Sequence, residues 1–150
     1  MTELKSIVLV EDHPNDVELT LEVLADIQLV NEVVVLTDGE EALDYLYRRG
    51  RYQLRDPLHP AVILLDFKLP KLDGLAVLRT IKSDPALKPI PVVMLTSSRE
   101  ERDLVESYQL GVNAYVVKPV DFTQFSEAIR QLGCFWAILN ERPPGSVSKA

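Results

Sequence analysis

The stretch AVILLDFKLPKLDG, residues 61–74, joins an unbroken apolar run to Asp66 and then to a polar loop. A run that does not alternate with polar residues is typical of a strand whose two faces are both buried. Four further runs have the same character: IVLV at 7–10, VVVL at 33–36, VVML at 92–95 and AYVV at 114–117. Five such runs predict a parallel sheet with helices on both faces.

Amphipathic stretches alternate with these runs, and helices are expected at about 15–27, 38–49, 74–83, 99–110 and 121–141. We predict that Asn15 caps the first helix, and that Gly50 and Gly111 end the second and the fourth. The expected apolar faces are Val17, Leu21, Leu24 and Ile27 in the first helix, and Ala42, Leu43, Leu46 and Tyr47 in the second. Five strands that alternate with five helices indicate a doubly wound α/β domain.

The composition suits one globular domain, since 47% of the 150 residues are hydrophobic and 26% are charged. The formal net charge of -7 opposes direct binding of nucleic acid, because affinity for a phosphate backbone depends on Lys and Arg. We expect neither a signal peptide nor a membrane span. Cys134 is the only cysteine, so we expect a small buried hydrophobe at this position in a cytoplasmic protein.

Two segments are longer than this fold requires. Residues 47–60, YRRGRYQLRDPLHP, form a basic connection where α/β loops usually have about 2 to 6 residues. The last expected helix is also long, and it carries Phe135 and Trp136 near its end. We assign residues 1–141 to one domain and residues 142–150 to a flexible tail.

Polar side chains follow most of the predicted strands, and ligands of open parallel sheets bind beyond the carboxyl ends of the strands. Glu11 and Asp12 follow the first strand, Asp66 the third, Thr96 and Ser97 the fourth, and Lys118 the fifth. Thr37 and Asp38 follow the second strand, which we expect to lie at the outside of the sheet, away from the others.

Each of these residues alone also has an ordinary structural explanation, as a solvated turn residue, a helix cap or a surface charge. Together, at one edge of the sheet, they indicate a functional site. Three neighbouring carboxylates repel one another unless they share a cation, and hard oxygen ligands suit Mg²⁺. A lysine at the same edge suits a phosphoryl oxygen.

From Ile7 to about Leu132 the sequence resembles the receiver domain of two-component response regulators. The matching marks are Glu11-Asp12, Asp66 followed by LPKLDG, Thr96, and Lys118-Pro119, in this order and at suitable spacing. The resemblance implies a flavodoxin-like sheet with the strand order 2-1-3-4-5 and five helices. The long loop and the aromatic end of the last helix are similar to a single-domain subgroup that includes cyanobacterial and bacterial phytochrome regulators.

The resemblance implies that Asp66 accepts a phosphoryl group from a phosphohistidine of a sensor histidine kinase. Phosphoryl transfer of this kind depends on positioning and on neutralisation of charge. The resemblance further implies that Mg²⁺ (or Mn²⁺) is held by Glu11, Asp12, Asp66 and the backbone carbonyl of Lys68. Lys68 departs from the polar amide often found two residues after the acceptor, so we expect an altered lifetime of the phosphoryl group.

By the same resemblance, Lys118 pairs with a phosphoryl oxygen and Thr96 donates a hydrogen bond to another. Thr96 and Tyr115 would form the switch, although Tyr115 could equally be an aromatic core residue with its hydroxyl at the surface. The Lys118–Pro119 peptide bond is expected to be cis. His13 is expected in the loop that enters the first helix, and His59 has no partner visible in the sequence.

We expect a signalling protein without an output domain, which changes a binding surface when it is phosphorylated. This surface would comprise the fourth helix, the fifth strand and the final helix, and it would form a two-fold homodimer with Phe135 and Trp136 at the interface. Both aromatic residues could instead belong to the core. A phytochrome-type photoreceptor kinase is the expected donor.

Two other functions remain open on the residues alone. A metal-dependent phosphatase would use Asp66 as a transient nucleophile, but such enzymes usually have an acid two residues downstream, where this chain has Lys68. A degenerate receiver that only binds is disfavoured, because every reacting residue is present.

Overall fold

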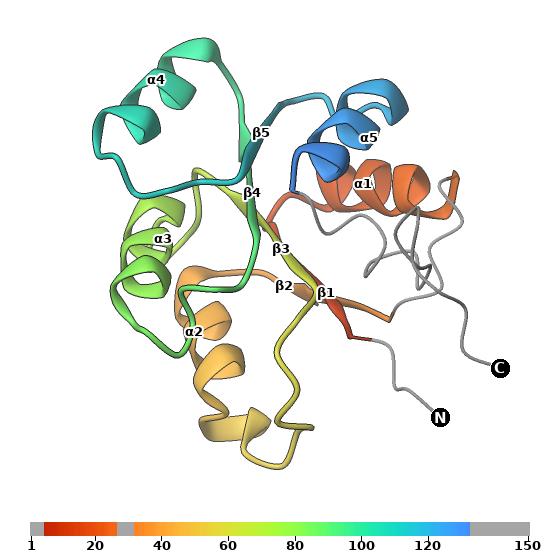
Figure 1. The fold of residues 1–150 in the computed structure, drawn as a ribbon. Coiled ribbons are helices and arrows are strands. Elements are labelled where there is room, and N and C mark those ends of the chain that lie inside the picture. Colours follow the sequence, from red (N-terminus) through yellow and green to blue (C-terminus); the bar gives the residue numbers. More distant parts are fainter. Residues whose placement is uncertain (1–4, 27–31, 133–150) are drawn as a thin grey trace, which may run out of the picture.

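Five parallel strands form one sheet in the computed structural model, which describes residues 5–26 and 32–132. They are β1 (Ile7–Val10), β2 (Val33–Leu36), β3 (Val62–Asp66), β4 (Val92–Thr96) and β5 (Ala114–Val117). Their order across the sheet is β2-β1-β3-β4-β5, and every neighbouring pair is parallel. The predicted fold class and strand order are therefore confirmed (Figure 1).

Four of the α-helices in the described residues connect successive strands, and the fifth follows β5: α1 (Pro14–Asp26), α2 (Gly39–Tyr47), α3 (Gly74–Ser83), α4 (Arg99–Ser107) and α5 (Phe122–Gln131). A short 3₁₀ helix, η1 (Gly50–Tyr52), follows α2. Helices α1 and α5 lie on one face of the sheet, and α2, α3 and α4 lie on the other (Figure 1). This is the layered arrangement that continuous apolar strands require, because both faces of the sheet are then covered.

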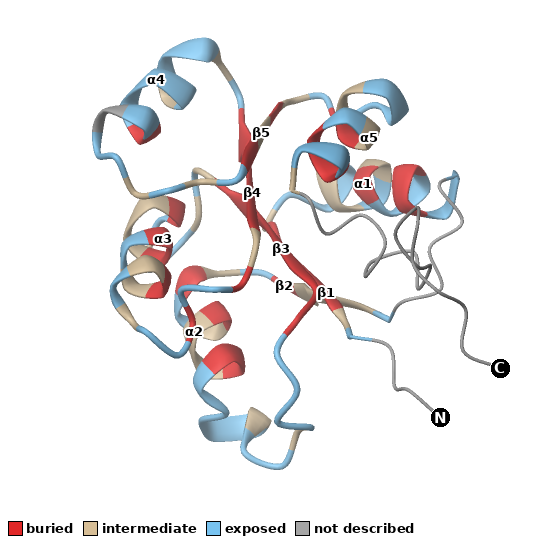
Figure 2. Cartoon of the chain, viewed as in Figure 1, coloured by how far each residue is buried: buried red, intermediate tan, exposed pale blue. Residues whose placement is uncertain are grey.

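The central strands are the most buried part of the molecule. Every residue of β1, β3 and β4 is buried, whereas the edge strands β2 and β5 keep partly exposed positions (Figure 2). Successive side chains point to opposite faces. Ile7 and Leu9 therefore pack with α1 and α5, and Val8 and Val10 pack with α2 and α3.

Helix α1 differs from the prediction at its start and along its face. It begins at Pro14, and the Val17 amide donates to the His13 carbonyl at 3.0 Å, so Asn15 lies inside the first turn and is not the cap. Proline suits this first position because it has no N–H group to satisfy. The buried residues are Thr20, Val23 and Leu24. Leu21, which was predicted on the same face as Val17 and Leu24, is 36% exposed, and Ile27 lies outside the described residues.

Helix α2 ends earlier than predicted. Its last residue is Tyr47, and Arg48 adopts the left-handed conformation with a φ of 55°. Gly50 begins η1 instead of ending the helix. Tyr45 is buried where Tyr47 was expected, because the Tyr52 ring packs edge-on against Tyr45 with 5.1 Å between centroids.

Helix α4 also ends before the predicted glycine. Its final residue is Ser107, and Tyr108 caps it. Gln109 and Gly111 both take positive φ values, of 51° and 75°, in the turn that leads to β5. The chain therefore leaves the helix through a left-handed residue that is not glycine, which sequence preferences disfavour.

The long connection before β3 is packed against the end of α2. The Arg55 guanidinium donates to the carbonyl oxygens of Tyr45 at 2.6 Å and Leu46 at 3.3 Å, and it stacks 4.2 Å from the Tyr45 ring centroid. The last carbonyls of a helix have no partner within the helix. Arg55 therefore provides a donor for the Leu46 carbonyl and a second donor for the Tyr45 carbonyl, which also accepts from the Arg48 amide at 3.2 Å.

Helix α5 is described as far as Gln131. Its expected continuation to residue 141, Cys134 and the tail at 142–150 lie outside the described residues. Among the helices that the structure describes, none has the length and apolar character needed to cross a lipid bilayer.

Candidate functional site

The carboxyl ends of β1, β3, β4 and β5 bring the predicted residues to one edge of the sheet. Asp66 is the last residue of β3 and pairs with Leu95, and Thr96 is the last of β4 and pairs with Val117. Lys118 directly follows β5, and its amide donates to the Thr96 carbonyl at 2.7 Å. The Lys118–Pro119 peptide bond is cis. Asp38, after the edge strand β2, lies apart and caps α2.

Three carboxylates meet at this edge. Glu11, Asp12 and Asp66 each offer one oxygen atom, and these atoms lie within 4.8 Å of one another. Glu11 is fully buried and Asp66 is 3% exposed. The buried Asp12 Oδ1 atom accepts no hydrogen bond, although buried polar atoms nearly always have a partner. An oxygen-only set with an unpaired acceptor fits a hard divalent cation, which binds carboxylate and carbonyl oxygens.

The Lys118 ammonium lies among carboxylates. Its Nζ atom is 2.5 Å from Glu11 Oε1, 2.9 Å from Asp66 Oδ1 and 3.2 Å from Asp16 Oδ2. Burial alone would lower the pKa of Lys118, but its contacts with Glu11 and Asp66 outweigh burial and raise the pKa. Lys118 is therefore a permanent positive charge at the edge of the carboxylate group.

The fold shifts the pKa of the Asp66 carboxyl strongly. Burial raises the pKa of Asp66 to about 7, and the negative charge of Glu11 adds to this rise. The hydrogen bond from Lys118 acts in the opposite direction. A buried carboxyl resists ionisation unless positive charge is close by. In the metal-free protein, Asp66 therefore ionises near neutral pH.

Thr96 and Tyr115 lie on neighbouring strands. Thr96 is fully buried, and its Oγ1 atom has no hydrogen-bond partner. Tyr115 is partly buried, and the Arg102 guanidinium of α4 lies 5.0 Å from the centroid of its ring. The pKa of Tyr115 is raised, first by burial and then by the charge of Glu106, against the effect of Arg102.

The loop after Asp66 depends on Gly74. A Cβ atom at Gly74 would lie 2.0 Å from the backbone oxygen of Asp66, so only glycine permits this approach. Asp73 caps α3 by accepting from the Ala76 amide at 2.9 Å. The Asp73-Gly74 pair thus fixes the start of α3 directly beneath the candidate acceptor.

Lys68 points its side chain toward α4. Its Nζ atom lies 3.6 Å from Glu101 Oε2, and the side chain is 77% exposed. Glu101 Oε1 accepts from the Ser97 amide at 2.8 Å. The cap of α4 is Ser98, whose hydroxyl accepts from the Glu101 amide at 3.2 Å, so neither Thr96 nor Ser97 is the cap.

The two histidines occupy different places. His13 is exposed, and its backbone N–H donates to Glu11 Oε2 at 3.4 Å, which is a loop contact. His59 precedes β3 and lies beside Lys5, Pro89 and Pro91 at the amino ends of the strands. It is therefore at the opposite edge from the carboxylates.

Asp16 is the residue of this edge that the sequence analysis missed. It lies in the first turn of α1, and its carboxylate accepts a hydrogen bond from Lys118, 102 residues away in the chain. Two facts in the sequence pointed to it, namely the helix expected after Glu11-Asp12 and the acid in its first turn. A first turn that follows a strand lies at the carboxyl edge of the sheet.

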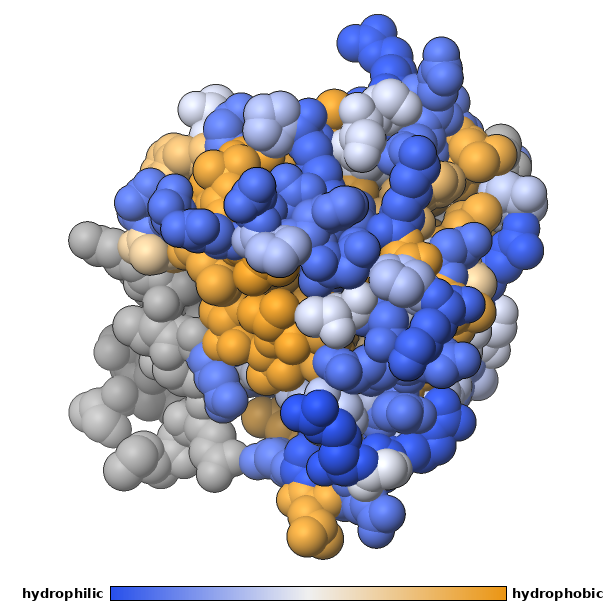
Figure 3. Space-filling view, turned by 180° about the vertical axis from the view of Figure 1, so that it is seen from behind, coloured by the Kyte–Doolittle hydropathy of each residue, from blue (hydrophilic) through white to orange (hydrophobic). Residues whose placement is uncertain are grey.

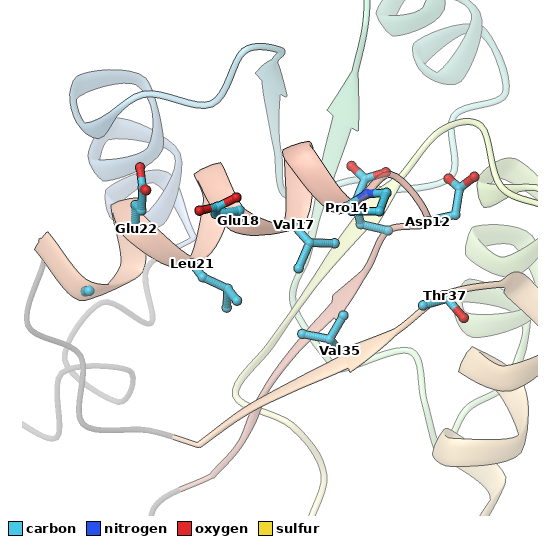
Figure 4. Close-up of a pocket in the computed structure, with 10 residues that line it drawn as sticks. Asp12, Pro14, Val17, Glu18, Leu21, Glu22, Val35 and Thr37 are labelled. Carbon is cyan, nitrogen blue, oxygen red and sulfur yellow. The ribbon is translucent and has the colours of Figure 1, made fainter.

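An apolar groove leads away from the acidic edge along α1. It has a volume of about 610 Å³, and Pro14, Val17 and Leu21 of α1 lie along it opposite Val35 of β2 (Figure 4). The back of the molecule has a broad apolar area (Figure 3). Leu21 is exposed because it lines this groove and not the interior.

Comparisons with known proteins agree with this geometry. Residues 7–130 match the family described as the response regulator receiver domain. Response regulator Rcp1 of Synechocystis sp. is 41% identical over 132 residues, which cover 88% of this chain and 88% of that protein. A crystal structure of the Mn²⁺-bound form of Rcp1 is similar with a TM-score of 0.73 and 39% identity, and the match covers 94% of this chain and 99% of that chain.

Two bacteriophytochrome response regulators are more similar in structure. RtBRR has a TM-score of 0.88 and 61% identity, with 96% of this chain and 87% of that chain covered. AtBRR has a TM-score of 0.87 and 64% identity, with 93% of this chain and 100% of that chain covered. The strand order, the acidic edge and these matches lead to one conclusion: this chain belongs to the response regulator receiver domain family of signalling proteins.

Proposed function

We propose that this protein is a response regulator in which Asp66 accepts a phosphoryl group from a phosphohistidine of a sensor histidine kinase. One observation carries the proposal. The Asp66 carboxylate lies 2.9 Å from the Lys118 ammonium and within 4.8 Å of carboxylate oxygens of Glu11 and Asp12. A nucleophile between an ammonium and a cation-binding group is arranged for transfer of a highly charged group.

Glu11, Asp12 and Asp66 would hold Mg²⁺ or Mn²⁺, together with the backbone carbonyl of Lys68. The converging oxygens and the unpaired Asp12 Oδ1 atom support this assignment. So does the description of the Rcp1 structure as Mn²⁺-bound. The cation, when bound, neutralises charge on the phosphoryl oxygens and on the carboxylates.

In the transfer itself, a carboxylate oxygen of Asp66 forms the new bond to phosphorus while the phosphorus–nitrogen bond of the donor histidine breaks. The imidazole leaves with the electron pair of that bond. Lys118 pairs with a phosphoryl oxygen, and the Thr96 hydroxyl donates a hydrogen bond to another. Both groups are preorganised, because Lys118 is 12% exposed and Thr96 is fully buried.

The response to phosphorylation would pass through Thr96 and Tyr115. The unpaired Thr96 hydroxyl has no bond to lose when it moves toward the phosphoryl group. Tyr115 would then turn inward and leave the Arg102 guanidinium that now stacks on it. This movement would change the surface of α4 and β5.

The partner surface would be the face of α4, β5 and α5, and it would join two copies of the protein about a two-fold axis. Leu104 of α4 is 46% exposed and Phe122 of α5 is 50% exposed, which supports a contact role for this face. Phe135 and Trp136, which lie outside the described residues, would extend the interface. The domain would span residues 1–141.

The donor would be a phytochrome-type kinase in the cytoplasm. This part of the proposal is supported by the names of RtBRR and AtBRR, which are bacteriophytochrome response regulators. Phosphotransfer from a panel of purified histidine kinases would identify the donor. A clear preference for a kinase without a phytochrome sensor would contradict this part.

Incubation with acetyl phosphate and Mg²⁺, followed by separation of phosphorylated protein, tests the function. We expect a stable aspartyl phosphate that disappears in Asp66→Asn and in EDTA. Rapid turnover of phosphate esters would indicate the phosphatase instead, and no modification would indicate a binding module. Light scattering after size exclusion, on the protein and on Trp136→Ala, tests the dimer; a phosphorylated protein that stays monomeric at high concentration would contradict it.

A further inference from the structure

Asp16 contacts the central ammonium of the site, but it stands outside the group that would hold the cation. Lys118 Nζ donates to Asp16 Oδ2 at 3.2 Å. The converging carboxylate group consists of Glu11, Asp12 and Asp66 and does not include Asp16. Asp16 also has the most exposed side chain of the three carboxylates around Lys118, at 36%, whereas the side chains of Glu11 and Asp66 are almost completely buried.

The two buried partners of Lys118 have a second task. Glu11 and Asp66 belong to the candidate cation site, so their negative charge is shared between the ammonium and the cation. Two positive charges within a few ångströms repel each other, and the repulsion is strong where solvent is excluded. Occupation of the cation site therefore weakens the electrostatic attraction of Glu11 and Asp66 for Lys118. The charge of Asp16, in contrast, acts on Lys118 alone.

The backbone gives Asp16 a fixed position. It lies in the first turn of α1, which packs through Thr20, Val23 and Leu24 onto the sheet. Helix α1 follows β1 and Lys118 follows β5, and β3 and β4 lie between these two strands in the sheet. The Asp16–Lys118 pair thus connects the start of α1 with the end of β5, two strands away from the strand that carries Asp66.

We propose that Asp16 is a positioning residue for phosphoryl transfer, which keeps the Lys118 ammonium beside Asp66 while the cation site is filled. This inference rests on the proposed function. Without Asp16, the ammonium moves further onto Glu11 and Asp66 and competes with the cation for their oxygens. The expected result is weaker cation binding together with slower phosphorylation.

Calorimetric titration with Mg²⁺ tests the coupling without any measurement of activity. Four proteins are compared: the unmodified protein, Asp16→Asn, Lys118→Gln and the double variant. We expect Asp16→Asn to weaken Mg²⁺ binding by about three- to tenfold when Lys118 is present, and to change it by less than about twofold in the Lys118→Gln background. An equal loss in both backgrounds would mean that Asp16 acts on the cation only through its charge, and would overturn the proposal.

Glu18→Gln is the matched control. It removes the same charge from the same helix, and Glu18 lies among the residues of α1 that line the apolar groove (Figure 4). Among the described residues, the carboxylates in ion-pair contact with Lys118 are Glu11, Asp16 and Asp66. Its Mg²⁺ affinity should equal that of the unmodified protein. A loss as large as that of Asp16→Asn would point to the general charge of α1 and not to Asp16.

Phosphorylation by acetyl phosphate at saturating Mg²⁺ gives the second measurement. Asp16→Asn should react about tenfold more slowly, and Asp16→Glu should recover part of the rate because it restores a carboxylate for Lys118. A rate for Asp16→Asn equal to that of the unmodified protein would overturn this inference alone. Failure of the unmodified protein to react at all would overturn the proposed function.

Discussion

Replacement of Asp66 by asparagine should stabilise the metal-free protein, although it removes the proposed acceptor. Asparagine has nearly the shape of a protonated aspartate and carries no charge. In the folded protein, burial raises the pKa of Asp66 to about 7, whereas the same carboxyl in an unfolded chain ionises near pKa of about 3.9. Between these two values the folded state retains a proton that the unfolded state has lost, so the free energy of unfolding falls as pH rises.

The magnitude follows from the difference between the two pKa values. Each pKa unit corresponds to about 1.4 kcal/mol, so, relative to strongly acidic solution, the raised pKa of Asp66 lowers the free energy of unfolding by about 4 kcal/mol at about pH 8.5 and by about half of that at about pH 5.5. Asp66→Asn avoids this cost. The variant should therefore gain about 2 kcal/mol more over the unmodified protein at the higher pH than at the lower.

Urea denaturation followed by circular dichroism, in EDTA at both pH values, measures this difference. Asp103→Asn is the control, since it makes the same chemical change at an exposed position of α4, outside the group of Glu11, Asp12 and Asp66. A cation at about a hundred times its Kd should then stabilise the unmodified protein by about 2.7 kcal/mol and the variant by less, because one ligand is missing. A gain for Asp66→Asn that does not grow with pH in EDTA would refute the reasoning from burial.

Three further outcomes are expected. Lys68→Asn should shorten the lifetime of the aspartyl phosphate, because it removes an ammonium from the loop after Asp66 and leaves an amide that can position water. An unchanged rate of hydrolysis, measured on protein phosphorylated with acetyl phosphate, would contradict this. Arg55→Ala should lower the free energy of unfolding by about 1 to 3 kcal/mol, since it removes a donor from the Leu46 and Tyr45 carbonyls and the stacking on the Tyr45 ring. Arg51→Ala should change it by less than about 0.5 kcal/mol; equal urea midpoints for the two variants would refute the capping role. Phe125→Ala should lower the free energy of unfolding by about 3 to 5 kcal/mol, because Phe125 is fully buried between α5 and the sheet. A thermal unfolding midpoint within a few degrees of that of the unmodified protein would contradict this expectation.

The sequence alone predicted the sheet and most of the residues that meet at its carboxyl edge. Continuous apolar runs such as residues 62–65, which are short and rich in aliphatic residues, favour a strand covered on both faces. Once the strands are parallel, their carboxyl ends lie at one edge. The sequence therefore predicts that Glu11, Asp66 and Lys118 lie close together.

Details of the helices were decided by tertiary contacts. Periodicity cannot distinguish Tyr45 from Tyr47 as the buried residue of α2, because the choice depends on Tyr52 and Arg55 from a distant loop. Likewise, Leu21 belongs to the apolar side of α1 but lines a groove at the surface. A hydrophobic pattern shows which residues prefer burial, and the neighbouring elements decide which of them achieve it.

The sequence by itself therefore determined the fold class and the position of Asp66, the proposed acceptor, among the carboxylates around it, since these follow from local patterns and from the geometry of parallel strands. Only the tertiary structure decided where each charge finds its partner. Asp16 and Lys118 are 102 residues apart and meet at 3.2 Å, and Lys68 turns toward Glu101 of α4. Such pairs depend on the packing of α1 and α4 on the sheet, because a difference of a few ångströms decides whether two charges form a pair.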